Sequence, residues 1–164
     1  MATEFRGQII KTWLLQLSGT ATEKSKILCQ TAIELGLTER SKSIPGSALI
    51  QWTKTTPTNT PLWAAQSALL LLFANEWKPS THVEWCGMAS LLQRLYKKNS
   101  IAEMLSYLPK HINKDIAAGW ITAAIEEDAN FRRHKKENDF FGTRKNNYIF
   151  RTSFNIIILA SIFT

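Results

Sequence analysis

The sequence lacks the short motifs that mark common enzyme active sites. It contains no GxSxG nucleophile motif, no HExxH zinc-protease motif, no Walker loop and no Rossmann glycine set, and only seven of its 164 residues are glycine. Its three histidines, His82, His111 and His134, are dispersed along the chain. We therefore predict a protein that is not an enzyme and that uses no cofactor.

Cysteine is scarce, and its placement excludes the common metal and redox motifs. Cys29 and Cys86 lie far apart and neither belongs to a CxxC pair, so the chain has no zinc-ribbon or thiol-disulfide motif. His82 and Cys86 stand four residues apart on one face of an expected helix, but two ligands do not complete a zinc site. We predict no metal site and a reducing compartment.

No apolar stretch is long enough to predict a membrane-spanning helix, which needs about 20 predominantly apolar residues. The most apolar internal segment, residues 62–77, has polar residues near its ends, and the apolar run in residues 154–163 is shorter still. The N-terminus has an early acid, Glu4, and no long apolar run before Lys11, unlike a secretory signal. We expect a cytoplasmic protein with no transmembrane span.

What the sequence does contain is the composition of a folded globular protein. Hydrophobic residues make up 45% of the chain and charged residues 20%, which argues against disorder. A chain of this length buries roughly 70% of the surface that its unfolded form exposes. No segment before residue 140 shows the sustained period-two alternation of a strand, so the predicted fold class is all-α.

Three capping boxes, in which Ser or Thr is followed three residues later by Glu, each precede an apolar stripe of helical period. The pairs are Thr20 with Glu23, Thr81 with Glu84, and Ser100 with Glu103. Residues 62–77 form the expected central helix, with Thr60 as N-cap and Pro61 at the first helical position. A compact, bundle-like domain of six or seven helices is predicted, with faces that bury, among others, Ile27, Leu35 and Ile116.

Positive charge is concentrated in the C-terminal part of the chain. The formal net charge is +7, and residues 132–164 hold seven basic against two acidic side chains, which leaves +5 there. We predict a helical domain over residues 1–131 and, over residues 132–164, a basic and aromatic segment followed by an apolar tail. Attraction to nucleic acid or to an anionic surface is expected mainly from the second part.

One spacing resembles the start of a helix-turn-helix region. Ala32 is a small residue that permits close helix packing, Gly36 follows four positions later where the turn needs a left-handed backbone, and Leu37 can anchor the turn in the core. The compact motif then expects apolar residues where this chain has Lys42 and Pro45. The likeness is one of spacing and matches no named family.

DNA recognition by this region therefore requires a longer connector before the second helix. Residues 45–54 would supply that helix, with Trp52 anchoring it inside and its outer face toward DNA. The residues predicted to contact DNA are Ser47, Gln51 and Lys54, with Ser43 beside them. The competing interpretation is an ordinary helix C-cap followed by a helical hairpin.

Basic and aromatic residues interleave from Phe131 onward, a pattern that can bind phosphates and stack bases. The basic residues predicted to bind nucleic acid are Arg132, Arg133, Lys135, Lys136, Arg144 and Lys145. The competing interpretations are a solvated helix end and a site for an acidic protein or a lipid head group. Separately, Asp128 is predicted to pair with Arg132 at the favourable four-residue spacing.

The predicted function is non-enzymatic binding of DNA or RNA, as a small helix-turn-helix-like regulator or a genome-associated accessory protein. The alternative is a helical interaction or assembly protein with no nucleic-acid role. In that case a second copy of the chain or another protein would bind through the apolar tail, residues 156–163. That tail could also dock on the core or lie at a membrane surface.

Overall fold

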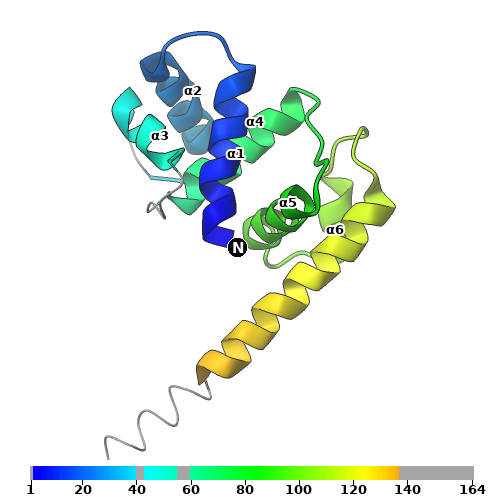
Figure 1. The fold of residues 1–164 in the computed structure, drawn as a ribbon. Helices are drawn as coiled ribbons and strands as arrows, with labels where there is room; N and C mark the ends of the chain where they lie inside the picture. Colours follow the sequence, from blue (N-terminus) through cyan, green and yellow to red (C-terminus); the bar gives the residue numbers. More distant parts are fainter. Residues whose placement is uncertain (1, 40–42, 55–59, 137–164) are drawn as a thin grey trace, which may run out of the picture. The chain divides into compact units, whose positions relative to one another are not determined.

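A computed structural model describes residues 2–39, 43–54 and 60–136 of the chain. None of these residues lies in a β-strand. The described chain contains the helices α1 (Ala2–Gln16), α2 (Ala21–Glu34), α3 (Gly46–Trp52), α4 (Leu62–Ala74), α5 (His82–Leu95) and α6 (Ile101–Ser106) (Figure 1). A further helix covers residues 114–136 and is called the last helix below. The predicted all-α class and number of helices are confirmed.

Two compact units divide the chain, residues 1–125 and residues 126–164. The first is a helical bundle that contains α1 to α6 and the beginning of the last helix. Of the second unit, the structure describes helical residues 126–136. The division between residues 131 and 132, drawn from charge, stays a prediction.

Helix α4 is central to the first unit because nearly all of its side chains are apolar. It packs against α1, α2 and α5. Ala64, Ala65 and Ala68 are fully buried, and their small side chains let neighbouring helices approach closely. Leu69 and Leu72 are buried to the same extent. A central helix starting at Leu62 is confirmed, but it ends at Ala74 and not at residue 77 as predicted.

Helix α1 covers α4 with an apolar stripe that repeats every four residues. Phe5, Ile9 and Trp13 are at most 3% exposed. Burying a side chain of this size stabilises the fold by about 1.5–3 kcal/mol. The Phe5 ring also lies directly over Gly87 of α5, so that a β-carbon at position 87 would fall 1.9 Å from the Phe5 Cγ. The contact between α1 and α5 therefore depends on glycine.

All three predicted capping boxes are present, at the starts of α2, α5 and α6. In the first, the Glu23 N–H donates to the Thr20 Oγ1 at 3.3 Å, and the Thr20 N–H donates to the Glu23 carboxylate at 2.7 Å. The backbone and hydroxyl hydrogen bonds from Thr20 lower the pKa of Glu23. Burial raises the pKa of Glu84, but hydrogen bonds from Ser80 and Thr81 outweigh it and leave that pKa below its usual value.

Helix α2 ends in a Schellman motif. The Gly36 N–H donates to the Ile33 carbonyl at 3.0 Å, and the Leu37 N–H donates to the Ala32 carbonyl at 2.8 Å. Gly36 has φ of 65°, the left-handed conformation that favours glycine. The turn expected from Ala32, Gly36 and Leu37 is therefore confirmed as a helix C-cap.

Helix α4 ends with the same hydrogen bonds but carries a glutamate at the left-handed position. The Glu76 N–H donates to the Phe73 carbonyl at 3.2 Å, and Glu76 has φ of 57°.

Replacing Glu76 by glycine is expected to stabilise the protein. A residue with a side chain loses about 1–2 kcal/mol of stability in the left-handed conformation, and glycine avoids most of that loss. Glu76→Gly is therefore expected to raise the free energy of unfolding in urea by about 1 kcal/mol. The matched reverse change, Gly36→Ala, is expected to lower it, since the added β-carbon would meet nothing within 4 Å and only the backbone effect remains. A Glu76→Gly variant no more stable than the wild type would contradict this reading of the turn.

Three residues expected in the core are exposed instead: Ile27 (43%), Leu35 (49%) and Ile116 (47%). Helix α2 packs against α3 and α4 through a narrower face that includes Leu28 and Ala32. Ile27 and Leu35 lie at the edges of that face, where the described part of the chain leaves them exposed. The helical period of the apolar residues was predicted correctly, but the buried face is narrower than predicted.

The expected cap of α4 is shifted by one residue. Pro61, not Thr60, is the N-cap, and the helix begins at Leu62. The Thr60 hydroxyl lies 3.5 Å from the Trp52 carbonyl instead of capping α4, and the Thr60 carbonyl accepts a 3.3 Å hydrogen bond from Arg6 Nη1. Burial, with the charge of nearby Arg94 as second cause, lowers the pKa of Arg6.

Over residues 2–39, 43–54 and 60–136, no helix combines the length and the apolarity that crossing a membrane requires. The apolar run in residues 154–163 lies outside the described residues.

Candidate nucleic-acid interface

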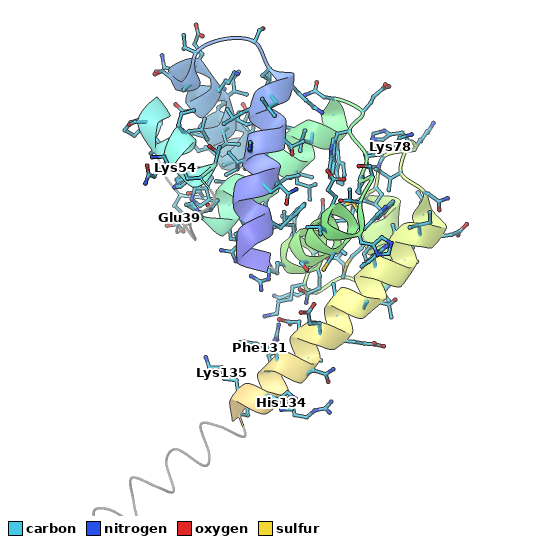
Figure 2. The ribbon with its side chains drawn as sticks, in the orientation of Figure 1. Glu39, Lys54, Lys78, Phe131, His134 and Lys135 are labelled. Atoms are coloured by element: carbon cyan, nitrogen blue, oxygen red, sulfur yellow. The ribbon has the colours of Figure 1, made fainter. Side chains whose placement is uncertain are left out.

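The first candidate surface is the outer face of α3. Ser47 and Gln51 are exposed and lie one turn apart, so they share one side of the helix. Lys54 is exposed just beyond the C-cap residue, Thr53, and is labelled in Figure 2. Ile50 shares this surface and is 46% exposed. The structure therefore places two of the three predicted residues on the helix and the third directly after it.

The predicted second helix, residues 45–54, is longer than the helix observed. Pro45 has extended backbone angles, φ −60° and ψ 143°, and acts as N-cap, so α3 begins at Gly46. After Trp52, the Lys54 N–H donates to the Gln51 carbonyl at 3.3 Å in a turn. The seven residues of α3 make about two helical turns. If α3 enters a DNA groove, only its two turns and Lys54 can make the contact.

Helix α3 is fixed against the rest of the first unit by one buried hydrogen bond and by its apolar side. Ser25 of α2 is fully buried, and its hydroxyl donates at 2.8 Å to the Ile44 carbonyl in the segment that leads into α3. Leu49 is fully buried, and half-buried Trp52 packs edge-on against Trp63 with 6.0 Å between ring centroids. The expected anchoring of α3 by Trp52 is confirmed.

The connector between α2 and α3 differs from that of a compact helix-turn-helix motif. It covers residues 35–45, whereas the compact motif uses a turn of about three or four residues. Residues 40–42 within it lie outside the described residues. The arrangement observed is a pair of packed helices joined by a longer connector.

The second candidate surface is the basic end of the last helix, residues 131–136, all of which are exposed. Phe131 is 67% exposed. Lys135 follows it by one turn, and Figure 2 shows the two on the same side of the helix. Arg133 and Lys136 are exposed as well. This helix end therefore presents an aromatic ring and several cations to solvent.

Arg132 forms the ion pair predicted from the sequence. Its Nη2 contacts the Asp128 Oδ2 one turn earlier in the helix. Exposed pairs of this kind stabilise a helix by about 0.3–0.5 kcal/mol, so a phosphate can compete with the carboxylate. Arg144 and Lys145, also predicted to bind nucleic acid, lie outside the described residues.

A third surface was not predicted from the sequence. The rings of Tyr96 and Tyr107 stack with centroids 4.6 Å apart, and Lys97 and Lys98 are exposed immediately after Tyr96. The two tyrosines are separated in sequence and end different helices. Apolar periodicity assigns single helices and not ring contacts between helix ends, so it gave no signal for this pair.

His82 and Cys86, the pair considered as metal ligands from the sequence, do not lie in a metal-binding environment in the described part of the chain. The His82 ring packs edge-on against Trp120, with 5.6 Å between centroids, and Cys86 is half-buried. Among the described residues, no group of three or more His, Cys, Asp or Glu side chains is placed to hold a metal ion.

Comparison with protein-family models, with characterised proteins and with solved structures gives no match for this chain.

Proposed function

We propose that this protein binds nucleic acid and does not catalyse a reaction. The observation that carries the proposal is the exposed run from Phe131 to Lys136, in which a ring and several cations lie on the surface of one helix end. Binding of this kind gains free energy when Lys and Arg displace the cations condensed along the phosphate backbone.

Charge supports the same proposal. Residues 132–164 carry +5 of the chain's +7, so the attraction to a polyanion is concentrated in the C-terminal part of the sequence, to which this helix end belongs. Contacts of this kind position a protein on the backbone and carry no sequence information. The basic end alone therefore accounts for general affinity.

Sequence preference, in this proposal, comes from α3. An exposed Gln51 side chain can make the two hydrogen bonds that adenine offers in the major groove, and Ser47 can bond to several base edges. Lys54 would contact phosphate. The short α3 limits the contacts to a few base pairs, so the expected preference is modest.

The test is fluorescence anisotropy with labelled duplex and single-stranded oligonucleotides over a range of salt concentrations, using the full chain. The variant Arg133→Ala/Lys135→Ala/Lys136→Ala is expected to bind at least about tenfold more weakly at low salt, because three phosphate contacts are lost. Its duplex salt slope is expected to fall in magnitude by about 2–3. The physical reason is the release of fewer counterions.

The matched control removes the same charge from exposed lysines elsewhere, in the variant Lys11→Ala/Lys26→Ala/Lys78→Ala. It is expected to keep most of the affinity. Equal losses in the two variants would assign binding to net charge and not to the basic helix end. Failure of the wild-type chain to bind any oligonucleotide would refute the proposal and favour the protein-interaction alternative.

A further inference from the structure

Tyr96 and Tyr107 form a stacked ring pair where α5 and α6 end. Their planes are inclined by 21° and their centroids are 4.6 Å apart. Tyr107 is 55% exposed, whereas Tyr96 is half-buried. A ring that is stacked on one side and open to solvent offers a surface on which another planar group can stack.

The pair is held in place by its surroundings. The Asn99 N–H donates to the Tyr96 carbonyl at 2.8 Å, which turns the chain back toward α6. Met104 and Leu108, on either side of Tyr107 in the sequence, are 2% and 4% exposed and fix this end of α6 in the core. A ligand that stacks here would not have to order the tyrosines first.

Three exposed lysines lie close to the two tyrosines in the sequence. Lys97 and Lys98 are exposed next to Tyr96, and Lys110 is exposed three residues after Tyr107. The one carboxylate in residues 94–110 is Glu103, which accepts hydrogen bonds from the Ser100 N–H at 2.7 Å and the Ser100 hydroxyl at 3.0 Å. It is engaged in capping α6, so the described structure pairs none of the three lysines with it.

We propose that the Tyr96–Tyr107 pair is a stacking site for an unpaired base of single-stranded nucleic acid, whose neighbouring phosphates contact Lys97 and Lys98. The inference rests on the proposed nucleic-acid function. It adds that the bound nucleic acid is single-stranded and that it contacts a second site on the protein. Stacking tolerates any base, because every base has a π-face. Duplex DNA offers no such face along its length, since its bases are stacked on one another.

The experiment compares full-length variants by anisotropy on a labelled oligothymidine of about twelve nucleotides and on a duplex of equal length. Tyr107→Ala is expected to weaken single-strand binding about tenfold and to leave duplex binding unchanged, since stacking on one base is lost. Tyr107→Phe keeps the ring and is expected to bind as the wild type does. Lys97→Ala/Lys98→Ala is expected to lower the single-strand salt slope by about 1.4.

The outcomes separate this site from the basic end of the last helix. If Tyr107→Ala binds oligothymidine like the wild type while Arg133→Ala/Lys135→Ala/Lys136→Ala is weakened, the stacking site is refuted and the proposed function stands. If only Tyr107→Ala is weakened, the stacking site is supported and the assignment of affinity to residues 131–136 fails. Equal weakening of single-strand and duplex binding by Tyr107→Ala, or loss of binding in Tyr107→Phe, would overturn the stacking mechanism.

Discussion

Gly87→Ala is expected to lower the free energy of unfolding by about 3 kcal/mol, the upper end of the usual cost of overpacking a core. The added β-carbon would lie 1.9 Å from the Phe5 Cγ and 2.2 Å from both Phe5 Cδ atoms. Phe5 is 3% exposed, so its ring has no free space to move into. Either the ring leaves its site or α1 moves away from α5, and both lose buried apolar contact. Urea denaturation followed by circular dichroism measures the change.

The matched control is Gly119→Ala in the last helix, where an added β-carbon would meet nothing within 4 Å. Alanine is favoured over glycine inside a helix by about 1 kcal/mol, so this variant is expected to be more stable than the wild type. A Phe5→Ala background is expected to remove most of the penalty at position 87, because the clashing ring is absent. Unchanged stability of Gly87→Ala in the wild-type background would show that α1 does not pack on α5 as described.

Much of the fold could be predicted from the sequence because its signals are local. A capping box joins residues three apart, so Thr20 with Glu23 and Thr81 with Glu84 reveal helix starts without knowledge of the tertiary structure. The left-handed turn at Gly36 was predictable for the same reason. The pairing of Asp128 with Arg132 likewise depends only on helical spacing.

Features that depend on a second helix could not be predicted. Which edge residues of an apolar stripe are covered depends on where neighbouring helices end, so Ile27 and Leu35 were wrongly expected in the core. Glycine is required at position 87 because the ring of Phe5, a residue of another helix, fills the space that a β-carbon would occupy. The sequence alone does not show whether a glycine in a predicted helix is packed closely against another helix or has no close neighbour.

The candidate site shows the same limit. Exposure of Ser47 and Gln51 follows from the helical period once α3 is assigned, whereas Lys54 lies beyond the helix; all three are exposed. The stacked Tyr96–Tyr107 pair depends on how the ends of α5 and α6 meet, which periodicity does not specify. Local patterns thus identify charged and polar surfaces, whereas contacts between helix ends require the tertiary structure.

Gly46→Ala is expected to detach α3 from α2 and to lower the free energy of unfolding by about 2 kcal/mol, within the usual cost of overpacking. The added β-carbon would lie 2.7 Å from the Thr22 nitrogen and 2.8 Å from the Ala21 carbonyl carbon. These are backbone atoms at the start of α2, and no side-chain rotation can relieve the contact. The movement of α3 would strain the nearby hydrogen bond from the Ser25 hydroxyl to the Ile44 carbonyl.

The sign of this effect distinguishes tertiary contact from helix propensity. With no neighbour, alanine at a helix start would be neutral or stabilising relative to glycine, so a loss of stability isolates the clash with α2. Ser47→Ala, at the next and exposed position, is expected to change stability by less than about 0.5 kcal/mol. Amide hydrogen exchange is expected to show faster opening of α3 in Gly46→Ala, with α1 and α4 affected less. A stable Gly46→Ala variant with unchanged exchange in α3 would mean that α3 is not seated against α2, and the surface formed by Ser47 and Gln51 would then lack the rigid support that base recognition requires.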